Sequence, residues 1–259
     1  MALVEVATEG DVATLTLNRP DARNALSVEL CEAIILGLGD VDRSHARSLI
    51  VRGAGSVFCS GADVNAVSGT DGLDFLPTFE KMLETLARFR IPTVAAIQGA
   101  ALGGGFQLAC CCDFRIASAD AKLGIPAARL GILVNFENIE RLVLLAGIAR
   151  TKEVLMTARS YSGAEAEATG LVTMHVEADA LDDAVLRFAT ELAARSPLSV
   201  QGTKRAIETV SDQLSGVRAT KPGSADAIDE LVAQAYRSRD LQEGLKALSE
   251  KREPDFTGM

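Results

Sequence analysis

In the first half of the chain, short hydrophobic runs with strand-like alternation are separated by longer amphipathic stretches. The runs lie at 4–7, 12–17, 48–51, 57–59, 93–97 and 114–117. Two of the stretches between them carry apolar residues at helical spacing: one follows an N-capping Ser27, and the other covers residues 73–89 and is regular only from Pro77 onward. Strands that alternate with helices predict stacked or parallel sheets rather than a sandwich.

From about residue 137 the strand pattern almost disappears and helical periodicity takes over. The only clear strand in this part is 172–176. Helices are predicted at 137–147, 151–158, 163–169, 179–195, 197–214 and 225–250. The pattern therefore predicts a mixed α/β core followed by a helical C-terminal part, without a long linker between them.

Composition and charge narrow the classes of protein. The chain has 259 residues, of which 48% are hydrophobic and 24% charged, and this is typical of a globular protein with a sizeable core. The 26 Lys and Arg residues stand against 35 Asp and Glu, and no segment gathers basic residues, so we expect no nucleic-acid partner. The longest nearly apolar segment, 99–112, is too short and too rich in glycine to cross a bilayer, so we expect no membrane span. The N-terminal residues alternate like a strand and carry acidic groups, which predicts a cytoplasmic protein without a signal peptide.

The sequence gives little support for a metal or a thiol site. There are five cysteines, three of them adjacent at 110–112, and neighbouring residues on one backbone cannot all turn toward one metal. We expect reduced thiols in the core. His45 and His175 are the only histidines and lie far in sequence from the glycine-rich turns, so we interpret both as surface or packing residues and expect no metal site.

Three turn segments are the candidates for chemistry: 17–26, 58–63 and 99–108. The third contains three consecutive glycines, Gly103 to Gly105, between a strand and a helix. Such a turn lets a ligand approach the main chain and directs free N–H groups at it, which is typical of an anion or oxyanion site. The spacing matches neither a P-loop nor a dinucleotide fingerprint. Glycines required only for tight packing between strand and helix remain an alternative explanation.

Taken together, these segments closely resemble the enoyl-CoA hydratase/isomerase family of the crotonase superfamily. The matching motifs run in order through the chain: Leu17-Asn18-Arg19-Pro20 with Asn24-Ala25-Leu26, Phe58-Cys59-Ser60-Gly61-Ala62-Asp63, Gly99 to Leu108, Cys112-Asp113-Phe114-Arg115-Ile116-Ala117 and Glu250-Lys251-Arg252-Glu253-Pro254-Asp255-Phe256. The resemblance implies an α/β fold with a spiral of ββα repeats at 1–195 and a helical oligomerisation region at 196–259, assembled as a trimer or as a hexamer of two trimers.

The resemblance also implies a ligand and a site. An acyl-CoA thioester would bind with its carbonyl oxygen between the N–H groups of Ala62 and Gly104, and CoA would be part of the substrate, with no separate cofactor. Arg23 would reach the CoA phosphates unless it is merely solvated, and Phe256 would border the pocket of a neighbouring subunit. The other residues that the resemblance places at the substrate are Ala25, Leu26, Gly61, Asp63, Ala101, Gly103, Gln107, Pro126, Ala127 and Asn135. Of these, Asp63 would hold its loop through backbone N–H groups.

The chain departs from the hydratase pattern at the acid–base positions. Typical hydratases carry glutamates where this sequence has Gln107 and Ala127, and the carboxylate position of isomerases is Asn135 here. Glu137 is the remaining candidate for proton transfer, although a glutamate in the first turn of a helix also simply complements the dipole. We therefore expect an atypical lyase, isomerase or decarboxylase-type activity rather than efficient hydration of crotonyl-CoA. The alternative is a protein of the same fold that binds acyl-CoA without turnover.

Overall fold

The computed structural model describes residues 2–63, 71–218, 230 and 232–256, with only the backbone of 71–74 and 215–218. Its main sheet has six strands in the order β1-β2-β3-β4-β6-β8. Their bounds are β1 Val4–Glu9, β2 Val12–Leu17, β3 Ser48–Gly53, β4 Thr93–Ile97, β6 Phe114–Ser118 and β8 Met174–Val176. The first two strands form an antiparallel hairpin and every other neighbouring pair is parallel, as the alternation of strands and helices predicts.

A smaller sheet runs beside the main one and supports the turns of interest. It consists of β5 (Ala100–Leu102) and β7 (Lys122–Gly124), which pair in parallel. Single bridges from Cys59 to Ala101 and from Leu26 to Ala62 extend it. The strand predicted at 57–59 is therefore wrong, because Cys59 alone in this segment makes a β-bridge. Along the chain, β4 joins the main sheet, β5 joins the smaller sheet, and helix α4 follows. This order of two strands and a helix is the predicted ββα spiral.

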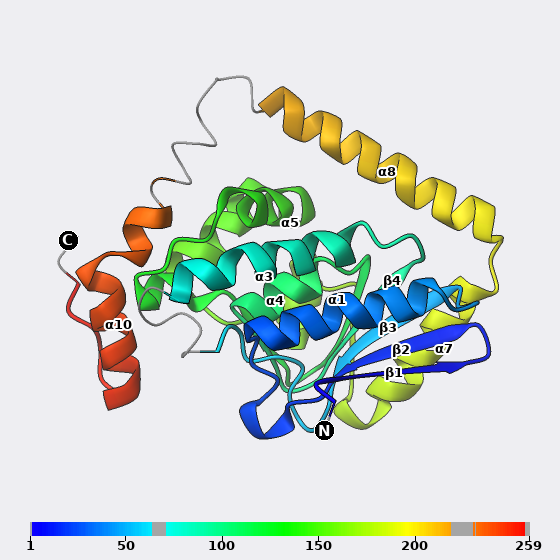
Figure 1. Ribbon diagram of the computed structural model, residues 1–259, viewed down its shortest axis with the longest axis horizontal. Helices are drawn as coiled ribbons and strands as arrows, with labels where there is room; N and C mark the ends of the chain where they lie inside the picture. The colour runs from blue at the N-terminus through cyan, green and yellow to red at the C-terminus, as the bar shows by residue number, and fades with distance from the viewer. Residues whose placement is uncertain (1, 64–70, 219–229, 231, 257–259) are drawn as a thin grey trace.

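Helices cover both faces of the main sheet (Figure 1). The helical elements are η1 Pro20–Ala22, α1 Val28–Asp42, α3 Asp71–Ala87, α4 Gly104–Cys110, η2 Pro126–Leu130, α5 Phe136–Thr157, α6 Gly163–Ala168, η3 Ala178–Ala180, α7 Leu181–Ala193, α8 Pro197–Arg218 and α10 Arg239–Glu250. Helices α1 and α3 pack together on one face, and α7 packs against strands β2, β3, β4 and β6 on the other. Successive side chains along each strand point to opposite faces of the sheet. Leu15 therefore joins the core beneath α1, and Val12 joins the core beneath α7.

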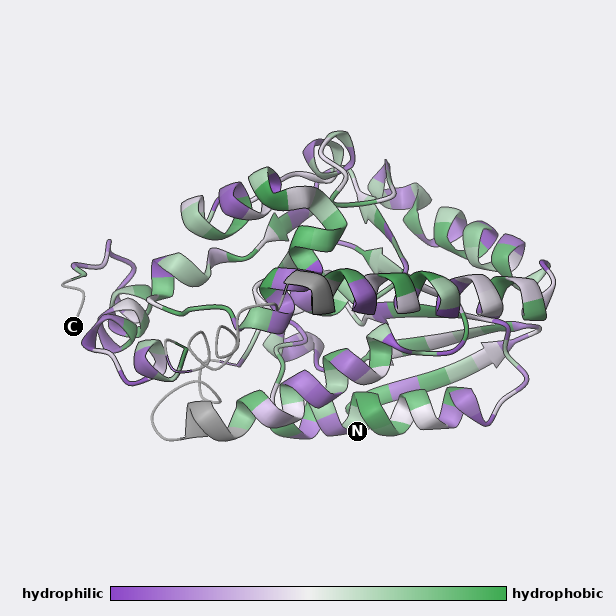
Figure 2. Ribbon diagram, turned by 90° about the horizontal axis from the view of Figure 1, so that it is seen from above, coloured by the Kyte–Doolittle hydropathy of each residue, from purple (hydrophilic) through white to green (hydrophobic). Residues whose placement is uncertain are grey.

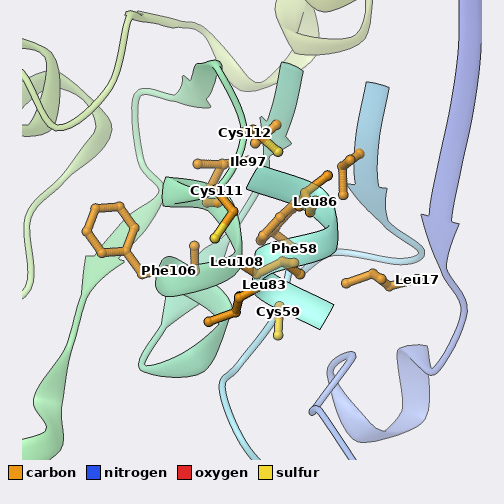
Figure 3. Packing of buried hydrophobic residues seen from close by; sticks show 14 of the residues in the cluster. Leu17, Phe58, Cys59, Leu83, Leu86, Ile97, Phe106, Leu108, Cys111 and Cys112 are labelled. Atoms are coloured by element: carbon orange, nitrogen blue, oxygen red, sulfur yellow. The ribbon is translucent and has the colours of Figure 1, made fainter. Parts of the chain in front are cut away.

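The larger core contains the cysteines. All five are free thiols, and four of them are buried. Figure 3 shows Cys59, Cys111 and Cys112 packed among leucine and phenylalanine side chains of this core. Burial raises the pKa of the Cys59 and Cys111 thiols to about 12, so both are neutral at physiological pH and pack as small apolar groups.

Three helix boundaries differ from those predicted. Helix α3 begins at Asp71 and includes Pro77 rather than starting there. The two helices predicted at 137–147 and 151–158 form one element, α5, and the predicted break between them is a kink at Gly147, where the backbone is not helical; the second helix follows directly after this residue. The predicted helix at 225–250 is interrupted, because Ser238 adopts an extended conformation and its Oγ accepts the N–H of Leu241 at 3.1 Å as the cap of a new helix, α10. Residues 219–229 and 231 lie outside the described residues.

The C-terminal helices lie on the outside of the molecule (Figure 1). Helix α8 is tied to the core by Lys204, whose Nζ lies 2.8 Å from Asp113 Oδ2, and it leaves Leu198 and Ile207 largely exposed. Figure 2 shows hydrophobic residues on outer helices as well as in the interior. None of the helices in the described ranges is both long enough and apolar enough to cross a membrane.

Candidate functional site

Two of the three predicted turns, 58–63 and 99–108, meet at one cavity of about 140 Å³ beside the smaller sheet. Its walls come from the turn after Cys59, the start of α4, the helix α3, the segment 125–138 and the C-terminal helices. Of the predicted site residues, the cavity is lined by Gly61, Ala62, Gly103, Gly104, Gln107, Pro126, Ala127 and Asn135. Segments that are far apart in the sequence thus contribute to a single, mostly apolar chamber.

Backbone pairing fixes the chain on both sides of Ala62, which lines this cavity. Leu26 N–H donates to the carbonyl of Gly61 at 2.8 Å, and Asp63 N–H donates to the carbonyl of Leu26 at 2.8 Å. The groups on both sides of Ala62 are therefore bound to the segment that contains Leu26. Gly61 must be glycine here, because its φ is +110° and a Cβ would lie 2.9 Å from the carbonyl oxygen of Leu102.

Gly104 lines the same cavity and is the first residue of α4. Gly103 has φ +53° and ψ −123°, a conformation that glycine adopts readily, and it turns the chain from β5 into the helix. In the described part of the chain, no acceptor binds the N–H of Ala62 or of Gly104.

The three glycines differ in their surroundings, and the packing explanation holds for Gly105. Gly103 supplies the turn, and Gly104 lines the cavity. Gly105 is a packing residue: a Cβ there would lie 2.4 Å from the carbonyl oxygen of Cys59 and 2.8 Å from its Sγ. A side chain at 105 would therefore push α4 away from the neighbouring segment.

Other predicted residues lie behind or beside the cavity. Leu26 and Ala101 are fully buried behind it. Arg23 is exposed, and its carbonyl accepts the N–H of Ser60 at 3.0 Å, so its segment runs alongside the turn that holds Ala62. Ala25 is partly buried in the same segment.

Arg19 joins these two segments, a role that the sequence did not indicate. Its Nη1 donates to the carbonyl of Ala25 at 2.6 Å, and its Nη2 lies 3.2 Å from Asp63 Oδ2. The Asp63 carboxylate thus binds the guanidinium of Arg19. That it also holds its own loop through backbone N–H groups stays a prediction. The available signal was the position of Arg19 within the Leu17-Asn18-Arg19-Pro20 motif.

Two predicted residues line other hollows of the surface. Glu137 is exposed at the start of α5, where its Oε2 accepts Nδ2 of Asn135 at 3.0 Å. It faces a neighbouring hollow with Lys81 and Arg141 and is not a lining residue of the cavity. Phe256 is 39% exposed and lines a separate groove next to α10.

Glu80 lines the cavity and was not predicted. It projects from α3, and its Oε1 accepts Nδ2 of Asn138 at 3.0 Å. Burial raises the pKa of Glu80, while hydrogen bonds from Asn135 and Asn138 and the charge of Arg141 act in the opposite direction. In the sequence Glu80 follows the apolar residue Phe79 and falls at the polar edge of an amphipathic helix, so the pattern suggested only a solvated side chain.

Tyr236 is a second polar residue that the sequence did not indicate. It reaches the cavity from the C-terminal part of the chain. Burial, with a smaller contribution from Glu80, raises the pKa of its phenol to about 12, so the phenol keeps its proton at neutral pH.

Comparisons with known proteins agree with this architecture. The family described as enoyl-CoA hydratase/isomerase matches residues 7–259. A probable enoyl-CoA hydratase of Bacillus subtilis is 34% identical over 269 residues, with 100% of both chains covered. An enoyl-CoA isomerase/hydratase of Mycosarcoma maydis is 34% identical, covering 94% of this chain and 92% of its own.

Solved structures give the same result for the fold. Methylmalonyl-CoA decarboxylase in complex with 2-nitronate-propionyl-CoA is similar with a TM-score of 0.90 and 26% identity over 99% of both chains. An enoyl-CoA hydratase/carnithine racemase from Magnetospirillum magneticum is similar with a TM-score of 0.79 and 31% identity, covering 100% of this chain and 97% of its own.

Proposed function

Because the chain belongs to the enoyl-CoA hydratase/isomerase family and has the crotonase fold that its motifs predict, we propose that it binds an acyl-CoA thioester in this cavity. The carbonyl oxygen lies between the N–H groups of Ala62 and Gly104. CoA is part of the substrate, and no separate cofactor takes part.

The observation that carries this proposal is the pair of backbone N–H groups that line one cavity and have no acceptor within the described residues. Enolate formation places negative charge on the thioester oxygen. Two preorganised donors in a largely apolar chamber stabilise that charge, and one such donor contributes about 2.7–4 kcal/mol in well-studied cases. A cavity of about 150 Å³ admits a molecule as large as benzene, so a short acyl group of about six carbon atoms fits here.

The CoA moiety runs along the segment that contains Arg23 and Ala25, beside the turn of Ala62. Arg23 is exposed and free to contact a phosphate. The protein self-associates as a trimer or hexamer through its C-terminal helices, and Phe256 contacts the neighbouring subunit. Exposed apolar residues on α8, among them Leu198 and Ile207, support this assembly.

The reaction depends on enolate stabilisation more than on activation of water. Gln107 and Ala127 line the cavity where a hydratase would need two carboxylates, and neither side chain transfers protons near neutral pH. A lyase, isomerase or decarboxylase-type reaction fits this composition, and the similarity to methylmalonyl-CoA decarboxylase supports such an activity. The same two residues favour the second candidate, an acyl-CoA-binding protein without turnover.

Isothermal calorimetry with butyryl-CoA, free CoA and butyrate tests the proposal. We expect butyryl-CoA to bind more tightly than free CoA, and butyrate to give no measurable heat. The control variant is Arg43→Ala, because Arg43 lies on the surface and pairs with Asp40 at the end of α1. We expect Arg23→Ala to weaken butyryl-CoA binding and Arg43→Ala to leave it unchanged. Equal affinity for butyryl-CoA and butyrate would remove the assignment.

A further inference from the structure

We propose that Glu80 is the catalytic residue that transfers the proton at the α-carbon of the bound thioester. This inference rests on the proposed function, because it requires a thioester with its carbonyl at Ala62 and Gly104. It assigns the missing acid–base group to a residue of α3 rather than to Glu137.

The first support is the position of Glu80. Within the described lining of the cavity it is the one carboxylate, and it shares this lining with the amide of Gln107 and the methyl group of Ala127. Helix α3 also approaches the site of the proposed oxyanion: a Cβ on Gly104 would lie 3.3 Å from the ring of Phe79, the residue before Glu80. Helix α3 therefore forms the wall beside Gly104, and Glu80 lines the same cavity from this helix.

The second support is the way in which the carboxylate is held. Asn138 is 5% exposed and donates its Nδ2 to Glu80 Oε1 at 3.0 Å. Arg141 Nη1 in turn donates to Asn138 Oδ1 at 2.5 Å, which fixes the amide with its NH2 group toward Glu80. Asn138 and Arg141 are positioning residues, and Oε2 of Glu80 is the atom that we assign to the proton.

The third support is a route for the proton to solvent. Glu80 lines both the inner cavity and an adjoining outer hollow of about 550 Å³. The charged groups around it are Glu137 and Arg141 from α5 and Lys81 and Glu84 from α3, and Tyr236 faces it from the C-terminal part. A proton taken from a substrate in the inner cavity can thus be exchanged with water in the outer hollow.

The step is balanced without any further reactant. The α-C–H bond breaks, its proton forms an O–H bond with Glu80 Oε2, and its electron pair moves into the enolate, with the charge on the oxygen at Ala62 and Gly104. Return of the same proton to the α-carbon restores the thioester. In a β,γ-unsaturated thioester, return to the γ-carbon moves the double bond.

Deuterium exchange into the α-position of butyryl-CoA in D2O, followed by mass spectrometry, tests this assignment. We expect exchange with the unmodified protein and a loss of about 10²-fold or more in Glu80→Gln, the usual contribution of a general base. The control is Glu32→Gln, an exposed glutamate of α1 that lines neither the cavity nor the outer hollow, and it should keep the exchange rate. Calorimetry on each variant shows whether the thioester still binds.

The pH dependence of the exchange rate distinguishes a catalytic Glu80 from a Glu80 with only a structural role. Because the carboxylate is the base, exchange should rise with pH through a pKa above the ordinary glutamate range and then level off. We expect this step to be absent in Glu80→Gln and to return, at a lower rate, in Glu80→Asp.

Several results would overturn the assignment of Glu80. These are a Glu80→Gln variant that binds and exchanges normally, a loss of exchange in Glu137→Gln but not in Glu80→Gln, or an unmodified protein that binds butyryl-CoA without exchange. If Glu80→Gln does not fold, an exchange rate of the unmodified protein that is independent of pH contradicts the assignment equally. Failure of the unmodified protein to bind any thioester is a different result, because it removes the proposed function itself.

Discussion

Gly104→Pro removes one N–H of the proposed pair with little change to the fold. Gly104 is the first residue of α4, a position where proline is well tolerated and where no acceptor in the described chain uses the N–H. The preceding Gly103 has ψ −123° and no Cβ, so the proline ring does not clash with a side chain before it. A Cβ at 104 would meet only the ends of the Leu26 and Phe79 side chains, at 3.3 Å.

The expected effect is large on rate and small on stability. Loss of one oxyanion donor lowers the rate by about 10²–10³, or about 2.7–4 kcal/mol of transition-state stabilisation. Gly104→Ala is the matched control, because it adds the same Cβ and keeps the N–H. Its 3.3 Å contacts require the neighbouring side chains to move by only a few tenths of an ångström, so we expect a change of only a few-fold.

The assay is α-deuterium exchange of butyryl-CoA at saturating concentration, with thermal unfolding to show that both variants are folded. The account requires Gly104→Pro to exchange about 10²-fold more slowly than Gly104→Ala. Equal losses in the two variants would assign the effect to the added carbon atoms. An unchanged rate in folded Gly104→Pro would refute the role of this N–H.

Three further predictions concern the scaffold of the site. Gly105→Ala forces a Cβ against Cys59 and should cost about 1–3 kcal/mol, seen as a lower melting temperature. Arg115 donates to the carbonyl of Ala109 in the last turn of α4 and to that of Cys112 after the helix. Arg115→Met should therefore cost about 3 kcal/mol, or roughly 2–4 °C of melting temperature for each kcal/mol. Burial raises the pKa of the Cys59 thiol to about 12, so the folded protein keeps this thiol neutral while the unfolded chain ionises it from about pH 8.5, the usual thiol pKa. The free energy of unfolding should therefore be unaffected by ionisation of Cys59 below about pH 8.5 and should fall as pH rises toward 12. Urea unfolding at increasing pH and thiol labelling at pH 8 check this, with labelling expected only after unfolding.

Much of the fold could be predicted from periodicity. Strands β2, β3, β4 and β6 are largely buried, and their side chains point alternately to the two faces of the sheet, so that Val12 and Leu15 of β2 join different cores. The short strands β5 and β7 could not be predicted, because three residues give no measurable alternation. The strand expected at 57–59 failed for a related reason: Phe58 and Cys59 are buried, but Cys59 alone makes a β-bridge.

The parts of the site that depend on backbone conformation could be predicted from the sequence. The parts that depend on side chains from different helices coming together could not. Gly61 and Gly103 adopt positive φ values that only a few residues tolerate, and their identity therefore carries a signal in the sequence. Glu80 becomes a cavity residue because α3 lies beside α5 and Asn138 binds its carboxylate, and periodicity along α3 contains no information about α5. Glu137 was favoured because it lies two residues after Asn135, yet its side chain faces the outer hollow.

The central claim is that Ala62 and Gly104 bind the carbonyl oxygen of a thioester, and infrared spectroscopy observes that bond directly. The carbonyl band is identified by subtracting the spectrum of bound unlabelled butyryl-CoA from that of bound butyryl-CoA labelled with ¹³C at the carbonyl. Two strong hydrogen bonds polarise the carbonyl, so the band should move to lower wavenumber when butyryl-CoA binds. The shift should be smaller in Gly104→Pro and retained in Gly104→Ala. A band at the position of the free thioester, measured on fully bound butyryl-CoA, would contradict the account.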